Sequence, residues 1–146
     1  TVAGQALLLE EFLAREARAG KLDTLRARLR PLAQPLLLHG HCHQKAFDAV
    51  SPILEVLRLI PDARPQLVES SCCGMAGSFG YEPGHQTVSR QMAEASLLPA
   101  LRAQADAVIV ADGTSCRHQI HDLLADGTGR QAQHVATLLA RQLGTP

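Results

Sequence analysis

Short apolar runs alternate with longer amphipathic stretches along this chain. Four runs are typical of buried strands because they are brief and rich in Leu, Val or Ile: 35–39, 66–69, 107–111 and, more weakly, 130–134. The stretches between them show helical spacing, and we expect helices over 7–18, from Asp23 to Pro31, over 51–60, over 85–104, around Ile120 to Leu124, and up to Leu143. This alternation predicts an α/β fold, a small and mainly parallel sheet of about four strands covered by helices.

Local signals refine these helices. The first one carries an apolar stripe with core-facing spacing, made of Leu8, Leu9, Phe12 and Leu13. Three polar residues are of the kind that caps helix N-termini: Asp23, Ser51 and Ser115. Pro99 is expected to kink or restart the 85–104 helix, because proline has no backbone N–H to donate.

At 146 residues the chain has the length of one domain with a sizeable core. We divide it into a helical lead-in at 1–34 and an α/β domain at 35–146. The first residues lack an initiator Met and a signal-peptide pattern, so the beginning looks like a cut through a longer protein. Fourteen basic residues balance fourteen acidic ones, which argues against nucleic acid as a partner, and the short apolar runs argue against a membrane span.

The four cysteines each follow a predicted strand. Cys42 comes after the first strand, Cys72 and Cys73 after the second, and Cys116 after the third. Because the carboxyl ends of parallel strands share one edge of a sheet, we expect loops at that edge to bring the four thiols together. Adjacent cysteines strain the ligation of one ion but suit a centre with several metal atoms. An iron–sulfur cluster is therefore our leading interpretation. We expect it to be of the 4Fe-4S type.

Other interpretations of the cysteines stay open. A zinc ion bound by four Cys, or by three Cys and one His, is a competitor, although structural zinc sites usually space their ligands more widely. The cysteines could also be small buried hydrophobic residues. A disulfide framework is not expected in a chain without export signals, and a bond between Cys72 and Cys73 would need an unusual eight-membered ring.

Neighbouring residues offer further chemistry. Five histidines crowd the same expected edge: His39, His41, His43, His118 and His121. His41 and His43 flank Cys42 on opposite sides of an expected extended backbone, so at most one of them should be an extra ligand or a hydrogen-bond donor at the site. His118 is a similar candidate beside Cys116, whose place in the first turn of a helix should favour a thiolate.

Two glycines and a lysine complete the expected site. Gly74 and Gly77 leave out side-chain bulk, so that backbone N–H groups can approach the sulfur atoms of a cluster. Lys45 would bring positive charge close to a thiolate-rich centre, or it could equally be an ordinary solvated lysine.

Together, the segments His41-Cys42-His43, Cys72-Cys73-Gly74 and Cys116 resemble the cysteine-rich CCG domain. That domain occurs in heterodisulfide reductase and in the iron–sulfur subunits of glycolate oxidase and anaerobic glycerol-3-phosphate dehydrogenase. The longer strings at 39–47, 72–82 and 111–119 look closest to the C-terminal domain of large bacterial fusion proteins. In those proteins an FAD-linked 2-hydroxy-acid dehydrogenase is joined to ferredoxin-type clusters. The resemblance covers residues 35–143.

The resemblance implies an electron-transfer role. A 2-hydroxy acid such as lactate, glycolate or 2-hydroxyglutarate would reduce FAD elsewhere in the parent protein. Electrons would then pass through ferredoxin-like domains to a cluster held by Cys42, Cys72, Cys73 and Cys116, and on to an unknown acceptor. The fragment alone would not be a complete enzyme, and its expected location is the cytoplasm, or the periphery of the inner membrane through the parent protein.

One departure from the family pattern limits how much of the family's cluster chemistry can be expected in this chain. The motif ordinarily ends Cys-x-x-Cys, whereas this chain ends it Cys116-Arg-His-Gln119, so the noncubane cluster of heterodisulfide reductase does not carry over intact. A regular four-cysteine cluster, a cluster with His118 or another His as an extra ligand, and a single zinc remain alternatives. Two other functions follow from them: a zinc-binding docking domain without a redox role, and an iron–sulfur domain that acts on a disulfide or thiol substrate.

Overall fold

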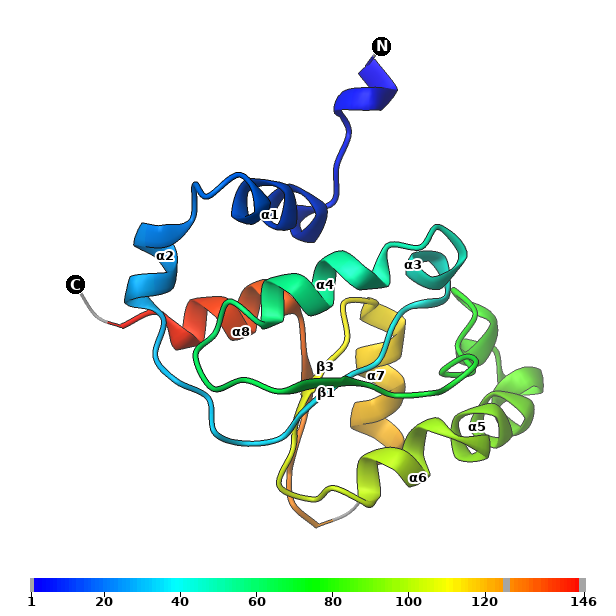
Figure 1. The fold of residues 1–146 in the computed structure, drawn as a ribbon. Coiled ribbons are helices and arrows are strands. Elements are labelled where there is room, and N and C mark those ends of the chain that lie inside the picture. The colour runs from blue at the N-terminus through cyan, green and yellow to red at the C-terminus, as the bar shows by residue number, and fades with distance from the viewer. Residues whose placement is uncertain (1, 125–126, 145–146) are drawn as a thin grey trace.

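A four-stranded parallel sheet forms the centre of the protein (Figure 1). The computed structural model describes residues 2–124 and 127–144. The strands are β1 (Leu36–Leu38), β2 (Pro65–Leu67), β3 (Val108–Val110) and β4 (Ala132–Gln133). They lie in the order β2-β1-β3-β4, and every neighbouring pair is parallel. The structure thus confirms the predicted α/β fold, and each strand overlaps its predicted range.

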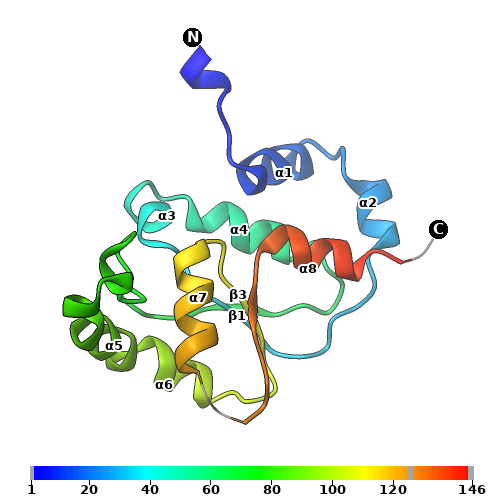
Figure 2. The ribbon, with the colours of Figure 1, turned by 180° about the vertical axis from the view of Figure 1, so that it is seen from behind.

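Helices cover both faces of this sheet. Their bounds are α1 Leu9–Arg18, α2 Asp23–Arg28, α3 Cys42–Ala46, α4 Val50–Leu57, α5 Gln86–Ala95, α6 Leu97–Arg102, α7 Thr114–Leu123 and α8 Val135–Gln142, with short 3-10 turns at Val2–Gln5, Phe79–Tyr81 and Pro83–His85. Helices α1, α4 and α8 lie on one side of the sheet, and α5, α6 and α7 lie on the other (Figures 1 and 2).

Alternation along the strands divides the buried apolar side chains into two cores. Leu36 and Leu38 of β1 pack against α4 and α8, whereas Leu37 between them packs against α6 and α7. Successive side chains of a strand point to opposite faces, and a parallel sheet with helices on both sides buries them all. The second core also contains Cys73 and Cys116, so two of the thiols belong to the packed interior.

The N-terminal segment packs against the rest of the chain. Ala14 of α1 and Leu29 and Leu32 after α2 lie in the first core, and Leu29 forms an antiparallel bridge with Leu143. The boundary at residue 35 between the helical lead-in and the α/β domain stays a prediction. The outer limits of these two segments, residues 1 and 146, lie outside the described residues. Within the described part of the chain, no helix has the length and apolar composition that crossing a bilayer requires.

The apolar stripe expected on α1 is only partly buried, so that prediction was wrong in detail. Leu8, Leu9 and Phe12 are 43–47% exposed, and the inward positions belong to Glu10 and Ala14. The carboxylate of Glu10 accepts a hydrogen bond from Gln44 Nε2 at 3.2 Å, which lets a charged residue face inward. Outside, the guanidinium of Arg15 lies 5.3 Å from the centre of the Phe12 ring.

The helix boundaries differ from prediction where capping was expected. Asp23 is the first residue of α2 rather than its cap, and α4 and α7 begin after Ala49 and Gly113, without a side-chain cap, instead of at Ser51 and Ser115. The 85–104 helix is divided at Ser96, as Pro99 predicted, because the proline ring clashes with the carbonyl four residues earlier.

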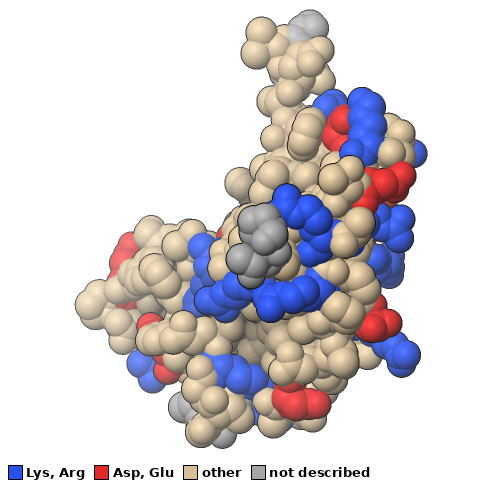
Figure 3. Space-filling view, turned by 90° about the vertical axis from the view of Figure 1, so that its left-hand side faces the viewer, with Lys and Arg blue, Asp and Glu red and all other residues tan. Residues whose placement is uncertain are grey.

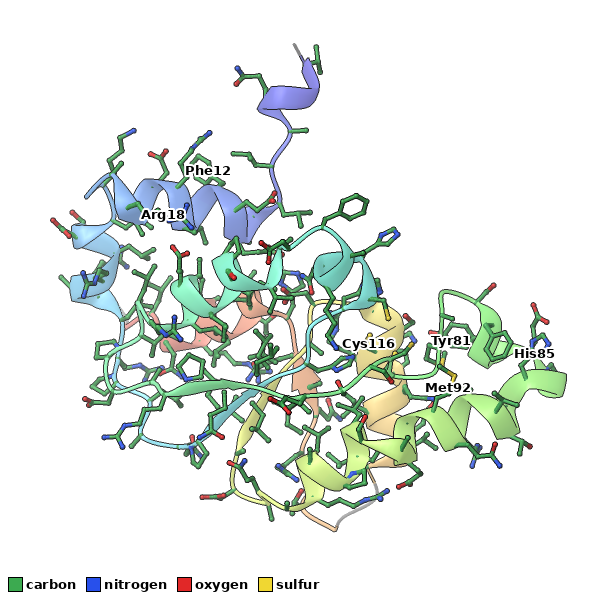
Figure 4. All side chains as sticks on the ribbon, turned by 45° about the vertical axis from the view of Figure 1, so that its right-hand side comes forward. Phe12, Arg18, Tyr81, His85, Met92 and Cys116 are labelled. Atoms are coloured by element: carbon green, nitrogen blue, oxygen red, sulfur yellow. The ribbon has the colours of Figure 1, made fainter. Side chains whose placement is uncertain are left out.

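Charge is unevenly distributed over the surface. Figure 3 views the end of the molecule that carries α2 and the last turn of α8, and there Lys and Arg side chains form a band. Basic residues of this end include Arg26 and Arg28 of α2 and Arg141 of α8. The edge of the sheet that carries the cysteines lies away from this band (Figure 4).

Candidate metal centre

The cysteines leave the sheet at its carboxyl edge, as predicted, and Cys116 lies in a helix, as expected, but Cys42 is helical rather than on a loop. Cys42 is the first residue of α3, a five-residue helix that the sequence pattern did not predict, and Cys116 lies in the first turn of α7. Cys72 and Cys73 lie in the irregular segment after β2. Figure 4 shows Cys116 at the start of its helix, on the side of the molecule that carries Tyr81.

The buried pair Cys73 and Cys116 forms the centre of the site. Their Sγ atoms are 3.1 Å apart, and the two residues are 2% and 1% exposed. Cys42 and Cys72 are half-buried, and all four cysteines have free thiols. Interaction with charge on Cys42 and on Cys72 contributes to raising the pKa of Cys116, so each of the other three thiols is close enough to affect this one.

The two central thiols differ in acidity. Hydrogen bonding from Cys116 holds the pKa of Cys73 well below the usual thiol range despite burial, and the nearby His39 ring and the Met75 backbone lower it further. The same interaction with Cys73, followed by burial, raises the pKa of Cys116. We expected the N-terminus of α7 to favour a thiolate at Cys116, but the thiolate is favoured at Cys73, because Cys116 keeps the shared proton.

Burial has the main effect on the outer cysteine of α3. It raises the pKa of Cys42, and hydrogen bonding with Cys72 adds to this effect. The positive charge of Lys45 acts in the opposite direction and lowers that pKa, which is the effect expected for this lysine.

His39 is a functional candidate that the sequence pattern did not single out as a ligand. Its ring is fully buried, and its Nδ1 lies 2.9 Å from Ser70 Oγ. The other ring nitrogen, Nε2, is buried without a hydrogen-bond partner in the described residues. One ring nitrogen of His39 and the sulfurs of Cys73 and Cys116 all lie within 4.8 Å of one another. The sequence signal that could have identified this residue is its position, because His39 directly follows the apolar run of β1.

The three histidines proposed as extra ligands occupy other positions. His41 is the N-cap of α3, where its Nδ1 accepts the backbone N–H of His43 at 3.2 Å, and the two rings meet edge to face at 5.9 Å. They therefore do not flank Cys42 on opposite sides of an extended backbone, since Cys42 is helical. His118 is exposed, and its Nδ1 lies 2.7 Å from the Tyr81 hydroxyl. Ligation by any of these three stays a prediction.

Both glycines of the cysteine segment have left-handed backbone angles. Gly74 has φ +91° and Gly77 has φ +70°. A Cβ at Gly74 would overlap the Ser89 carbonyl, whereas a Cβ at Gly77 would meet nothing within 4 Å. The Gly74 N–H donates to Cys72 Sγ at 3.2 Å, which is the kind of backbone contact with sulfur that was expected for this segment.

A cleft of about 550 Å³ adjoins the site. His41 and Gly113 line it, and a Cβ built on Gly113 would lie 3.0 Å from Cys116 Sγ. Leu8, Leu9 and Phe47 contribute apolar surface to the same cleft. The cleft therefore reaches close to the buried thiols from the exposed side of α3.

The donor set suits a soft or borderline metal centre. Thiolates with one imidazole favour iron–sulfur clusters or zinc over the hard cations Mg²⁺ and Ca²⁺, which prefer oxygen ligands. One ring nitrogen of His39 lies beside two thiols, and the Nε2 atom of the same ring is buried without a hydrogen-bond partner in the described residues. This arrangement fits a bound metal, because burying a polar atom without a partner is unfavourable.

Comparison with known proteins shows similarity to parts of two dehydrogenases. The chain is 30% identical over 115 residues to one subunit of the anaerobic glycerol-3-phosphate dehydrogenase of Escherichia coli strains K12 and O157:H7, a match that covers 79% of the chain and 28% of that polypeptide. It is 36% identical over 85 residues to D-2-hydroxyglutarate dehydrogenase of Haemophilus influenzae, covering 57% of the chain and 8% of that protein. No family model and no solved structure matches the chain. The chain is thus similar to a segment of dehydrogenase proteins and spans less than a third of their length.

Proposed function

We propose that the chain is an iron–sulfur electron-transfer domain of a flavin-dependent 2-hydroxy-acid dehydrogenase. The observation that carries this proposal is the contact between Cys73 and Cys116 at the carboxyl edge of the sheet, with Cys42 and Cys72 close enough to affect the pKa of Cys116. The similarity to segments of two dehydrogenases supports the link to oxidoreductases. The FAD-binding and ferredoxin-like partners, and a location in the cytoplasm or at the inner membrane, belong to the same proposal.

The residues of the chain would divide the work of the centre. Cys42, Cys72, Cys73 and Cys116 would hold the cluster, and His39 would offer a fifth donor. Once bound, a cluster supplies one-electron transfer between donor and acceptor. The protein would keep water from the inner thiols by burial and would stabilise thiolate charge through His39 and the Gly74 N–H.

A structural zinc site is the second candidate, and one observation favours it. The compact group of His39, Cys73 and Cys116 supplies three ligands of a type found in mononuclear zinc sites. Either Cys42 or Cys72 could supply a fourth. In that case the domain would dock neighbouring parts of a dehydrogenase without transferring electrons.

Metal analysis of anaerobically purified protein separates these functions. The electron-transfer proposal expects iron and acid-labile sulfide, broad thiolate-to-iron absorption, and a paramagnetic signal on one-electron oxidation or reduction. Cys42→Ser and Cys72→Ser should each lower the iron content, and so should His39→Ala if its nitrogen is a donor. His121→Ala is the matched control, since His121 is an exposed residue of α7 that contacts Asp122.

Stoichiometric zinc without thiolate-to-iron absorption, in protein that was never exposed to air, would refute the electron-transfer proposal and support the docking site. Turnover of a disulfide or thiol substrate by the iron-loaded protein would instead support the thiol-handling alternative.

A further inference from the structure

The two helices that begin near a cysteine have the same layout. In α3, Lys45 follows Cys42 by three positions, and in α7, Gln119 follows Cys116 by three positions. Residues three apart in a helix lie on one face, so each polar side chain lies one turn beyond a thiol and on the same side. Both polar side chains contact the segment around Cys72 and Cys73.

Gln119 holds the far end of that segment. Its side chain is buried, and its Nε2 donates to the carbonyl oxygen of Cys73 at 3.0 Å. The same nitrogen contacts the Ser89 carbonyl oxygen at 3.2 Å and the Ser89 hydroxyl at 2.9 Å. One amide group therefore joins α7, the cysteine segment and α5 in a place that water does not reach.

Lys45 holds the near end. Its Nζ donates to the carbonyl oxygen of Ser70 and, at 3.2 Å, to that of Ser71, the two residues before Cys72. Its side-chain carbons pack beside Gly40. In the described part of the chain Lys45 forms no ion pair with a carboxylate, so carbonyl binding is the polar role its geometry shows. Ser70 is held a second time by its hydroxyl, which contacts His39 Nδ1.

We infer that Lys45 and Gln119 are positioning residues that hold the Cys72–Cys73 segment at the distance from Cys42 and Cys116 that shared metal binding requires. Each couples a helix that carries one thiol to the backbone that carries the other two. Outer hydrogen bonds of this kind orient the ligands of a metal site before the metal binds. The inference rests on the proposed metal-binding function, but thiol spacing can be measured without a metal.

Two variants remove the donors and keep side chains of similar length. Lys45→Met and Gln119→Met replace them with unbranched apolar chains, and Lys21→Met and Gln91→Met are matched controls at exposed positions. Lys45→Arg retains a cationic donor and should restore the behaviour of the unchanged chain. Circular dichroism and thermal unfolding of every variant establish that the fold is retained.

The first readout is the bridging of Cys73 to Cys116 by dibromobimane in reduced, chelator-treated protein, mapped by mass spectrometry. The second is Co²⁺ titration, followed by thiolate-to-metal absorption. We expect both Met variants to give less bridging, an altered Co²⁺ spectrum and about 10- to 100-fold weaker Co²⁺ binding, with the controls unchanged.

Unchanged bridging and Co²⁺ affinity in both Met variants would overturn the inference. If Gln119→Met does not fold, the comparison of Lys45→Met with Lys45→Arg decides the question. Equal Co²⁺ affinity of these two variants would also overturn the inference. Failure of the electron-transfer proposal would look different: the unchanged chain would bind Co²⁺ tightly and respond to both variants, yet would hold no iron–sulfur cluster.

Discussion

Gly74→Ala tests whether the backbone at the vicinal cysteines is as constrained as the structure indicates. Gly74 has φ +91°, where an L-residue costs about 1–2 kcal/mol. The added Cβ would also lie 2.9 Å from the Ser89 carbonyl carbon and closer still to its oxygen. Both are backbone atoms, so no side-chain rotation relieves the overlap. Overpacking of this kind costs about 1–3 kcal/mol, which gives a total loss of about 2–5 kcal/mol.

Gly77→Ala is the matched comparison three residues away. Gly77 shares the left-handed conformation at φ +70°, but a Cβ there meets nothing within 4 Å. It should lose only the conformational part, about 1–2 kcal/mol. The difference between the two variants therefore isolates the close approach of Gly74 to Ser89 on α5.

Urea unfolding of the reduced, chelator-treated chain measures both losses. With a slope of about 2 kcal/mol/M, Gly74→Ala should lower the midpoint by about 1–2.5 M, and Gly77→Ala by less than about 1 M. Equal midpoints for the two variants would refute the reasoning, because they would show that the segment can move away from Ser89 without cost.

Three further predictions concern acidity, the exposed face of α1 and His118. Because folding lowers the pKa of Cys73, the reduced, metal-free chain should become more stable as pH rises toward about 8.5 and less stable as pH falls. Urea unfolding measures this dependence, and Cys73→Ser should flatten it. The raised pKa of Cys116 has the opposite sign, so stability should decline again at higher pH. On α1, Phe12→Ala should cost less than about 1 kcal/mol, whereas Ala14→Leu should cost about 1–3 kcal/mol by overpacking; similar losses would contradict the observed orientation of the helix. Tyr81→Phe removes the exposed hydrogen bond to His118 and should change the free energy of unfolding by less than about 0.5 kcal/mol without altering metal content. A fall in bound metal would contradict this and would give His118 a role at the metal centre.

The sheet and the edge that bears the cysteines could be predicted because they depend on regular patterns. Apolar runs separated by helical stretches require parallel strands, and parallel strands place the residues that follow them at one edge. The run at 107–111 contains β3, and Pro99 divided the helix before it, as expected.

What could not be predicted depends on contacts between distant residues. The inward position of Glu10 requires Gln44, which is 34 positions away. Likewise, α3 has only five residues, too few for a periodic pattern, and the N-cap at His41 is formed by an imidazole rather than by a common capping residue. His39 could not be distinguished from the other histidines near the cysteines until its burial placed one ring nitrogen near two sulfurs.

The split of the interior into two cores has a consequence for how the protein would respond to loss of the proposed metal. Cys73, Met75 and Cys116 pack with α5, α6 and α7, whereas α1, α4 and α8 pack on the opposite face of β1 and β3. Stripping the site should therefore speed amide hydrogen exchange first on the face that contains the sulfurs, while the opposite half keeps its protection. Because the site lies in only one of the two hydrophobic cores, binding at the site should change the rigidity of that core and not of the other.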